Sequence, residues 1–130
     1  MSFKLSSKSK SRLVGVDSRW PEIIDLALTI TLIDFGIPNY GGLRTSDDQL
    51  RLYLDGKSKC DGKTNISNHQ LGTAVDFYAY VDGKASWDHF HLAHVACALF
   101  AAANQLGYKV HWGGFFKPGG WDKPHLELID

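Results

Sequence analysis

The segment spanning residues 72–77 constrains the fold more than any other part of this sequence. In an extended chain, successive side chains point to opposite faces. One face of this segment is suited to a core and carries Thr73, Val75 and Phe77. The other face carries two minimal side chains and then a carboxylate, from Gly72, Ala74 and Asp76. Small residues let another group approach a strand closely, so we expect a polar site above this face, with His69 folding over it from the preceding loop.

A segment near the C-terminus has the same organisation. If the chain is extended here, Leu126 and Leu128 face a core, while His125 and Glu127 face the opposite side. Asp122 precedes His125 by three residues, on a loop that contains a proline. This segment therefore predicts a second group of polar side chains above a strand.

Two histidines and one carboxylate form the ligand set of an open zinc site, which has three protein ligands and one water. The candidate ligands are His69, Asp76 and His125. A structural zinc site made of thiolates is excluded, because two scattered cysteines, Cys60 and Cys97, cannot supply it. Each candidate taken alone is equally well explained as a loop or strand-edge residue, and no His-Glu-x-x-His helix is present. The spacing alone leaves both interpretations open.

Four further histidines need an interpretation. His111 is the rival ligand, because it lies on a neighbouring predicted strand, but it lacks the surrounding motif of His125. His89, His91 and His94 cluster at the start of a predicted helix. We expect them to be helix-face residues, with a second metal pair as the alternative.

Periodicity and breaking residues predict an α+β fold in which helices segregate from a few antiparallel strands. We expect helices to begin near Pro21, near Thr45 and after Asp88, the last one ending before Gly107 and burying Cys97. Cys60 is expected to be exposed. The predicted strands are 32–37, 73–80, 108–112 and 126–129.

With 130 residues, the chain suits a single domain over residues 1–130. Lys plus Arg and Asp plus Glu each number 14, which argues against a nucleic-acid partner. We expect the basic residues 1–12 to form a mobile arm, or a weak handle for an anionic surface. No run is apolar enough for a membrane span, and no signal peptide is recognised.

The motifs resemble those of the zinc D-Ala-D-Ala carboxypeptidase and L-alanyl-D-glutamate endopeptidase family, above all its small phage endolysins. That family has a Ser-x-His-x-x-Gly-x-Ala-x-Asp block and an acidic residue three positions before a second histidine. The matching residues are Ser67, His69, Gly72, Ala74, Asp76, Asp122 and His125. Further matching blocks are 42–45 with Gln49, 56–59 and 112–114. The likeness runs from about Leu13 to the C-terminus and departs at Phe115, where many such endolysins have Asp.

The resemblance implies a small antiparallel sheet packed with helices, with the zinc site on its open face. The D-Ala-D-Ala peptidases and the Hedgehog amino-terminal domain share this fold. It further implies that one zinc ion is bound by the three candidate ligands, that Asp122 is the general base, and that Arg44 stabilises the carbonyl oxygen as it gains charge. Ser67 either caps a turn or touches substrate, and Glu127 either orients a ligand or is exposed.

By this resemblance the chain is expected to cleave the L-Ala–D-Glu bond of the peptidoglycan stem peptide and to lyse the host cell. It would be a monomer without stable membrane insertion, made in the host cytoplasm and acting in the periplasm after the membrane has been permeabilised. Two alternatives stay open: a D-Ala-D-Ala carboxypeptidase or dipeptidase, and a zinc-stabilised wall-binding module without catalysis.

Overall fold

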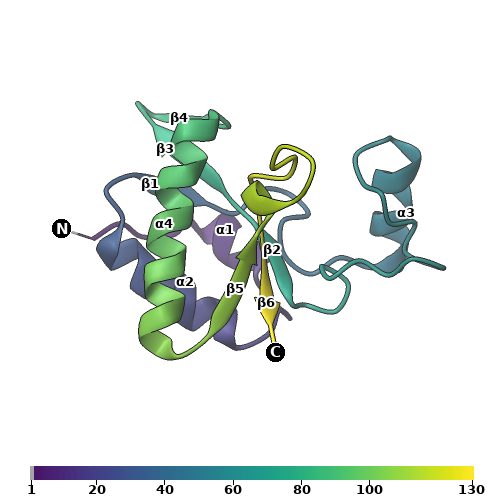
Figure 1. Ribbon diagram of the computed structural model, residues 1–130, viewed down its shortest axis with the longest axis horizontal. Helices are drawn as coiled ribbons and strands as arrows, with labels where there is room; N and C mark the ends of the chain where they lie inside the picture. Colours follow the sequence, from purple (N-terminus) through teal and green to yellow (C-terminus); the bar gives the residue numbers. More distant parts are fainter. Residues whose placement is uncertain (1) are drawn as a thin grey trace.

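The computed structural model describes residues 2–130 and shows two three-stranded antiparallel sheets with helices packed against them (Figure 1). This arrangement confirms the predicted α+β class. The first sheet has the strand order β1-β3-β4, formed by Asp34–Gly36, Tyr78–Val81 and Lys84–Ser86. The second has the order β2-β6-β5, formed by Ala74–Asp76, His125–Ile129 and Lys109–Trp112. The helices are α1 (Ser7–Arg12), α2 (Arg19–Ile30), α3 (Ser46–Leu54) and α4 (His89–Leu106), and Gly113–Phe115 adds one 3-10 turn.

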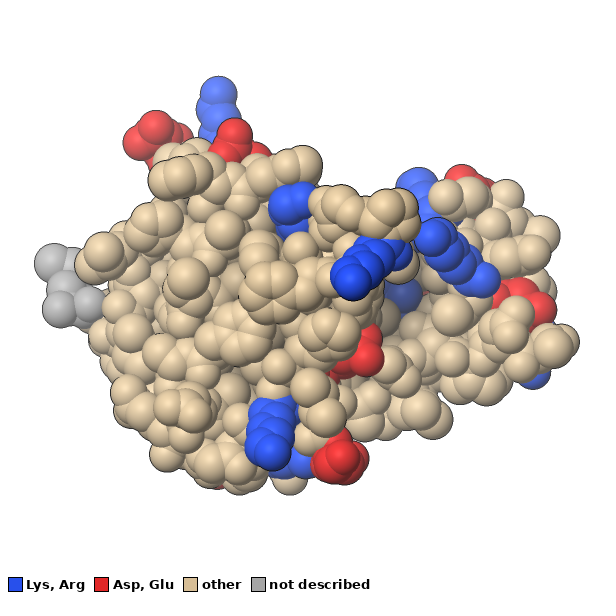
Figure 2. Space-filling model, viewed as in Figure 1, with Lys and Arg blue, Asp and Glu red and all other residues tan. Residues whose placement is uncertain are grey.

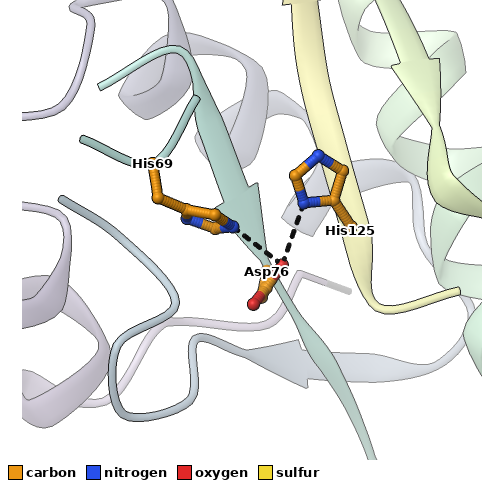
Figure 3. A group of neighbouring side chains, drawn as sticks. All are labelled: His69, Asp76 and His125. Carbon is orange, nitrogen blue, oxygen red and sulfur yellow. Dashed lines mark ion pairs between the residues drawn. The ribbon is translucent and has the colours of Figure 1, made fainter. Parts of the chain in front are cut away.

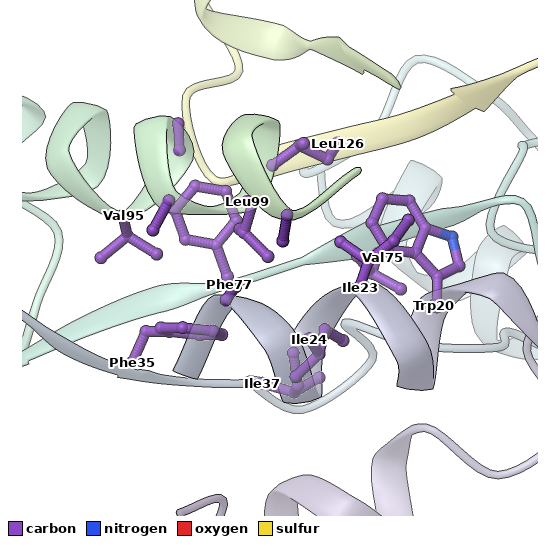
Figure 4. Close-up of a cluster of buried hydrophobic side chains, with 14 of the residues drawn as sticks. Trp20, Ile23, Ile24, Phe35, Ile37, Val75, Phe77, Val95, Leu99 and Leu126 are labelled. Atoms are coloured by element: carbon purple, nitrogen blue, oxygen red, sulfur yellow. The ribbon is translucent and has the colours of Figure 1, made fainter. Parts of the chain in front are cut away.

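The main core lies where α2 and α4 pack on each other and on the strands (Figure 4). The largest fully buried side chains include Trp20 and Ile23 from α2, Leu99 from α4, Leu126 from β6 and Phe77. Trp20 also donates its indole N–H to the carbonyl of Thr73 at 3.1 Å, so it ties α2 to the start of β2. Burial of these side chains supplies the main stabilisation of the fold.

The predicted strand 73–80 is divided in two by the structure. β2 ends at Asp76 and β3 begins at Tyr78, and the two strands belong to different sheets. Between them, the N–H of Phe77 donates to the carbonyl of Pro124 at 2.8 Å. The prediction of one continuous strand was wrong because alternation of side chains continues through Phe77, although its backbone pairs with a loop.

The helix boundaries follow the local signals. The Thr45 side chain accepts from the N–H of Asp48 at 3.1 Å and caps α3, and the Asp88 side chain caps α4. Gly107 adopts φ 80°, the left-handed conformation that ends many helices. Cys97 is exposed, against expectation, because the buried face of α4 is centred on Val95 and Leu99 and position 97 turns towards solvent. Cys60 is half-buried rather than exposed.

The N-terminal segment contains a docked helix where we expected a mobile arm. Ser6 caps α1 by accepting from the N–H of Ser9 at 3.1 Å. The buried Ser9 hydroxyl accepts from the N–H of Ile37 at 3.0 Å, and Arg12 donates to the carbonyl of Ile37 at 2.7 Å. These contacts attach α1 to the chain that follows β1.

Helix α3 projects on the opposite side of β2 from α4 (Figure 1). The chain between α3 and β2 is a polar loop without helices or strands, as the sequence predicted. None of the helices within residues 2–130 has the length and apolar character needed to cross a bilayer.

Candidate metal centre

Two side chains seven positions apart and a third that is distant in the sequence meet at one point (Figure 3). The Nε2 atom of His69 lies 3.2 Å from Oδ1 of Asp76, and Nδ1 of His125 lies 3.3 Å from the same oxygen. The three potential ligand atoms all lie within 4.8 Å of one another. The predicted metal ligands are therefore brought together by the fold, within reach of a single ion.

The register of the second sheet brings two of these residues together. Asp76 of β2 and His125 of β6 are direct cross-strand partners, so their side chains share a face. The preceding pair, Val75 and Leu126, points to the opposite face and is buried in the core. Burial of this apolar pair therefore helps to fix the register that aligns the polar pair.

His69 is held from outside the sheet. Its Nδ1 atom lies 3.1 Å from the carbonyl oxygen of Gly42, which fixes the ring tautomer with a proton on Nδ1 and leaves Nε2 free for an ion. The N–H of His69 donates to the hydroxyl of Ser67 at 3.2 Å, so Ser67 caps the turn, one of the two roles considered for it. Gly72, with φ +77°, then turns the chain into β2.

The other imidazole is oriented by a carboxylate. Nε2 of His125 lies 2.8 Å from Oε1 of Glu127, and the Asn68 side chain donates to Oε2 of Glu127 at 3.1 Å. Metal-bound histidines are commonly oriented by such carboxylates. Glu127 thus contacts the candidate ligand directly and is not a freely exposed strand residue.

Arg44 reaches the site from the segment just before α3. Its Nη2 atom lies 3.1 Å from Oδ2 of Asp76, its Nη1 donates to Gln49 at 3.1 Å, and its Nε donates to the carbonyl of Tyr40 at 2.7 Å. The guanidinium carries five N–H groups. One N–H on each terminal nitrogen therefore stays available for a ligand in the cleft.

Asp122 lies at the rim of the cluster, with Oδ2 3.8 Å from Nδ1 of His125. The backbone of Asp122 packs closely on Gly113: a β-carbon on Gly113 would lie 1.8 Å from the Asp122 carbonyl oxygen. The glycine of the Trp112-Gly113-Gly114 motif is thus required for close packing of the loop that carries Asp122.

The charges of the cluster fit a cation. Oδ1 of Asp76 is the one buried side-chain oxygen or nitrogen within residues 2–130 without a hydrogen-bond partner, although two imidazoles face it. Such an unpaired buried oxygen is costly, and an ion held by it and by the two ring nitrogens removes that cost. The donor set of two imidazoles and one carboxylate suits zinc.

Burial and mutual charge shift the pKa values in the cluster. Burial raises the pKa of Asp76, but the facing imidazoles outweigh it and hold that pKa below its ordinary range. Burial lowers the pKa of His125, whereas its contacts with Asp76 and Glu127 raise it, to about 9 on balance. Burial, followed by the charge of Asp76, raises the pKa of Asp122 above its usual value. The cluster therefore favours positive charge on the His125 ring and keeps Asp122 more basic than an exposed aspartate.

The remaining histidines lie outside this cluster. His111 is opposite Glu127 in the sheet register, but its ring packs against Phe116, with centroids 5.0 Å apart. His91 lies 2.7 Å from the Ser86 hydroxyl, and His94 is exposed. Within residues 2–130, no second group of three or more potential metal ligands is found.

The cluster opens into a cleft of about 360 Å³ between the loop 113–124 and the polar loop that follows α3.

Several residues that support the metal cluster were given no role from the sequence. The most important are Gln49, Asn68 and the carbonyl of Gly42. Gln49 had a signal in the motif resemblance, whereas a backbone carbonyl leaves none.

The profile of the family described as phage L-alanyl-D-glutamate peptidase matches residues 1–129. The chain belongs to this family. It is 28% identical over 140 residues to the L-alanyl-D-glutamate peptidase of Escherichia phage T5, covering 99% of this chain and 100% of that relative. The resemblance inferred from the motifs is thereby confirmed.

Solved structures agree with this assignment. The Serratia marcescens L-Ala D-Glu endopeptidase ChiX superposes with a TM-score of 0.82 at 33% identity, over 97% of this chain and 90% of that one. The L,D-carboxypeptidase DacB from Streptococcus pneumonia gives a TM-score of 0.52 at 20% identity, over 92% of this chain and 70% of that one. The second match shows a shared fold alone.

Proposed function

We propose that the L-Ala–D-Glu endopeptidase activity of this family member depends on one zinc ion held by His69, Asp76 and His125. The activity itself follows from family membership and from the relatives, and its substrate is the stem peptide of peptidoglycan. The observation that supports the zinc site most strongly is the convergence of two ring nitrogens on the unpaired Oδ1 of Asp76.

Held by His69, Asp76 and His125, a zinc ion would supply Lewis-acid chemistry and a bound water with a pKa of about 7. Asp122 acts as the general base: its carboxylate takes a proton from the attacking water and passes it to the leaving amine nitrogen. Its raised pKa and its place on the rim of the cluster support this role. Arg44 directs its free N–H groups at the carbonyl oxygen as negative charge develops there.

The metal assignment is tested by comparing two histidine variants. His125→Ala should lose bound zinc and activity together, because it removes a ligand from the cluster. His111→Ala is the matched control, from the adjacent strand, and should keep most of its zinc. Zinc content would be measured by mass spectrometry on purified protein, and loss of zinc in His111→Ala with retention in His125→Ala would overturn the assignment.

The role of Asp122 is tested separately. Asp122→Ala should keep the fold and zinc content but lower kcat by about a hundredfold or more, the usual contribution of a general base. Peptidoglycan sacculi would be digested and the new termini sequenced. New N-terminal D-Glu identifies the expected bond, whereas released D-Ala would indicate the carboxypeptidase alternative. Unchanged turnover in Asp122→Ala would show that Asp122 is not the general base.

We further propose that the enzyme reaches the wall from the host cytoplasm once the membrane is permeabilised, and that it acts as a monomer. The phage origin of the T5 relative supports this order of events. A turbidity assay on permeabilised cells, with and without chelator, would separate this lytic enzyme from a wall-binding module without catalysis.

A further inference from the structure

One wall of the cleft carries two cations that the proposed mechanism does not use. Lys57 and Lys59 both line the cleft, from the loop that follows α3. Within residues 2–130, neither ammonium group forms an ion pair with a carboxylate. Lys59 is nonetheless positioned, because its ammonium group lies 4.2 Å from the ring centroid of Trp121 on the opposite loop. Figure 2 shows Lys and Arg side chains around the hollow beside the part of the chain that contains α3.

Each of the other charged side chains in the cleft lies beside a group of opposite charge. Arg44 is paired with Asp76 at 3.1 Å, and Glu127 is paired with His125 at 2.8 Å. The carboxylate of Asp122, which also lines the cleft, lies 3.8 Å from the His125 ring nitrogen. Lys57 and Lys59, called the lysine wall below, therefore present positive charge to whatever enters the cleft. A ligand with a negative group on the side of this wall is favoured, because charge-assisted hydrogen bonds are stronger than neutral ones.

The loop that carries the lysines is fixed relative to the metal centre. The amide nitrogen of Gln49 donates to the hydroxyl of Ser58 at 2.7 Å and to the carbonyl of Cys60 at 2.8 Å. Its amide oxygen accepts from Arg44, which in turn contacts Asp76. Gln49 is fully buried. The position of the lysine wall is thus tied to a metal-site carboxylate through one rigid network.

The stem peptide carries an anionic group beside the bond that the family cleaves. In the stem peptide, D-Glu supplies the nitrogen of the scissile amide and continues the chain through its γ-carboxyl group, so its α-carboxylate is free and lies one carbon from the leaving nitrogen. We propose that Lys57 and Lys59 bind this α-carboxylate and make the enzyme selective for stem peptides in which it is not amidated. This inference rests on the proposed function, because it assumes that the L-Ala–D-Glu bond lies over the metal centre.

The test compares a stem tripeptide with its D-isoglutamine counterpart, in which the α-carboxylate is a carboxamide. The wild-type enzyme should have a kcat/KM about tenfold higher for the acid, since one charge-assisted hydrogen bond in a partly exposed site contributes on this order. The double variant Lys57→Met with Lys59→Met should reduce this ratio to near one, by raising KM for the acid and leaving the carboxamide unchanged. The double variant Lys84→Met with Lys109→Met removes two exposed lysines outside the cleft and should keep the wild-type ratio.

Equal rates for the two wild-type substrates, or an undiminished ratio in the cleft double variant, would overturn the proposal. Binding of both peptides would also be measured by calorimetry in the Asp122→Ala background, in which turnover is expected to be slowed by about a hundredfold or more. If the acid binds more tightly than the carboxamide only when the two lysines are present, but the wild type cleaves neither peptide, the proposed reaction is refuted and the carboxylate site is supported. Absence of that preference in binding would refute the carboxylate site itself.

Discussion

Replacing Gln49 with leucine tests whether one buried amide holds the site together. The side chain has no exposed surface and makes three hydrogen bonds: it accepts from Arg44 at 3.1 Å and donates to Ser58 at 2.7 Å and to Cys60 at 2.8 Å. Leucine is close to glutamine in volume, so the change removes these bonds with little change in packing. The effect should therefore report the polar network.

The magnitude follows from counting these bonds. Two neutral bonds contribute about 1 kcal/mol each, and the bond from a charged donor contributes about 1.5–3 kcal/mol. The loss is smaller than their sum, because Arg44 keeps Asp76 and Tyr40 as partners and water in the cleft can reach the loop. We expect a loss of about 2–3 kcal/mol, which for a chain of this size lowers Tm by roughly 8–12 °C.

The assay is thermal unfolding followed by circular dichroism in excess chelator, so that binding of metal to the native state does not contribute. Gln105→Leu is the matched control, because Gln105 is an exposed residue of α4. Its Tm should stay within about 2 °C of the wild type, since exposed substitutions have small effects. A decrease of less than 2 °C in Gln49→Leu would refute the idea that this amide organises the site.

Two further predictions concern a carboxylate near the metal centre and one remote from it. Glu127→Gln should weaken zinc affinity by about 10- to 100-fold, because the charge that orients His125 is lost; chelator competition measures this, and unchanged affinity would contradict it. Hydrogen bonds from Arg19 lower the pKa of Asp17 from 3.8 to about 2, so Asp17 stabilises the fold fully above pH 4 and this contribution is lost as the pH falls towards 2. Urea unfolding in chelator should show the difference between wild type and Asp17→Asn shrinking over that interval, and a constant difference would refute the linkage.

The elements that the sequence predicted well are those with local causes. The caps at Thr45 and Asp88 and the glycine after α4 act within a few residues of themselves. The inward direction of Leu126 and Leu128 follows from strand periodicity. The break at Phe77 could not be predicted in this way, because it depends on a hydrogen bond to Pro124, 47 positions further on.

The candidate site divides along the same line. His69, Asp76 and His125 were predicted because their spacing matches a motif, and the fold brings them together. The support from Gln49 and Asn68 was not predicted, because each acts through a partner distant in sequence. The docking of α1 was missed for the same reason: the buried hydroxyl of Ser9 bonds to Ile37, and nothing local in a lysine- and serine-rich segment indicates that contact.

The two halves of the metal centre are held by different kinds of structure. Asp76 and His125 are cross-strand neighbours, so their approach is fixed by the register of β2 and β6, and a one-residue slip would turn His125 into the core. His69 has no such partner in the sheet. It is placed by the segment 41–44, since Gly42 accepts from its ring and Arg44 donates its N–H to the His69 carbonyl at 3.2 Å.

That segment is itself packed against α1. A β-carbon on Gly42 would lie 1.8 Å from the carbonyl oxygen of Arg12, the last residue of α1. The carbonyl that orients His69 therefore keeps its place only while Gly42 can approach the helix end this closely. Helix α1 therefore supports the metal centre, although its last residue lies 57 positions before His69. The sheet alone would align two of the three ligands, and the third depends on the docking of a segment that the sequence suggested was mobile.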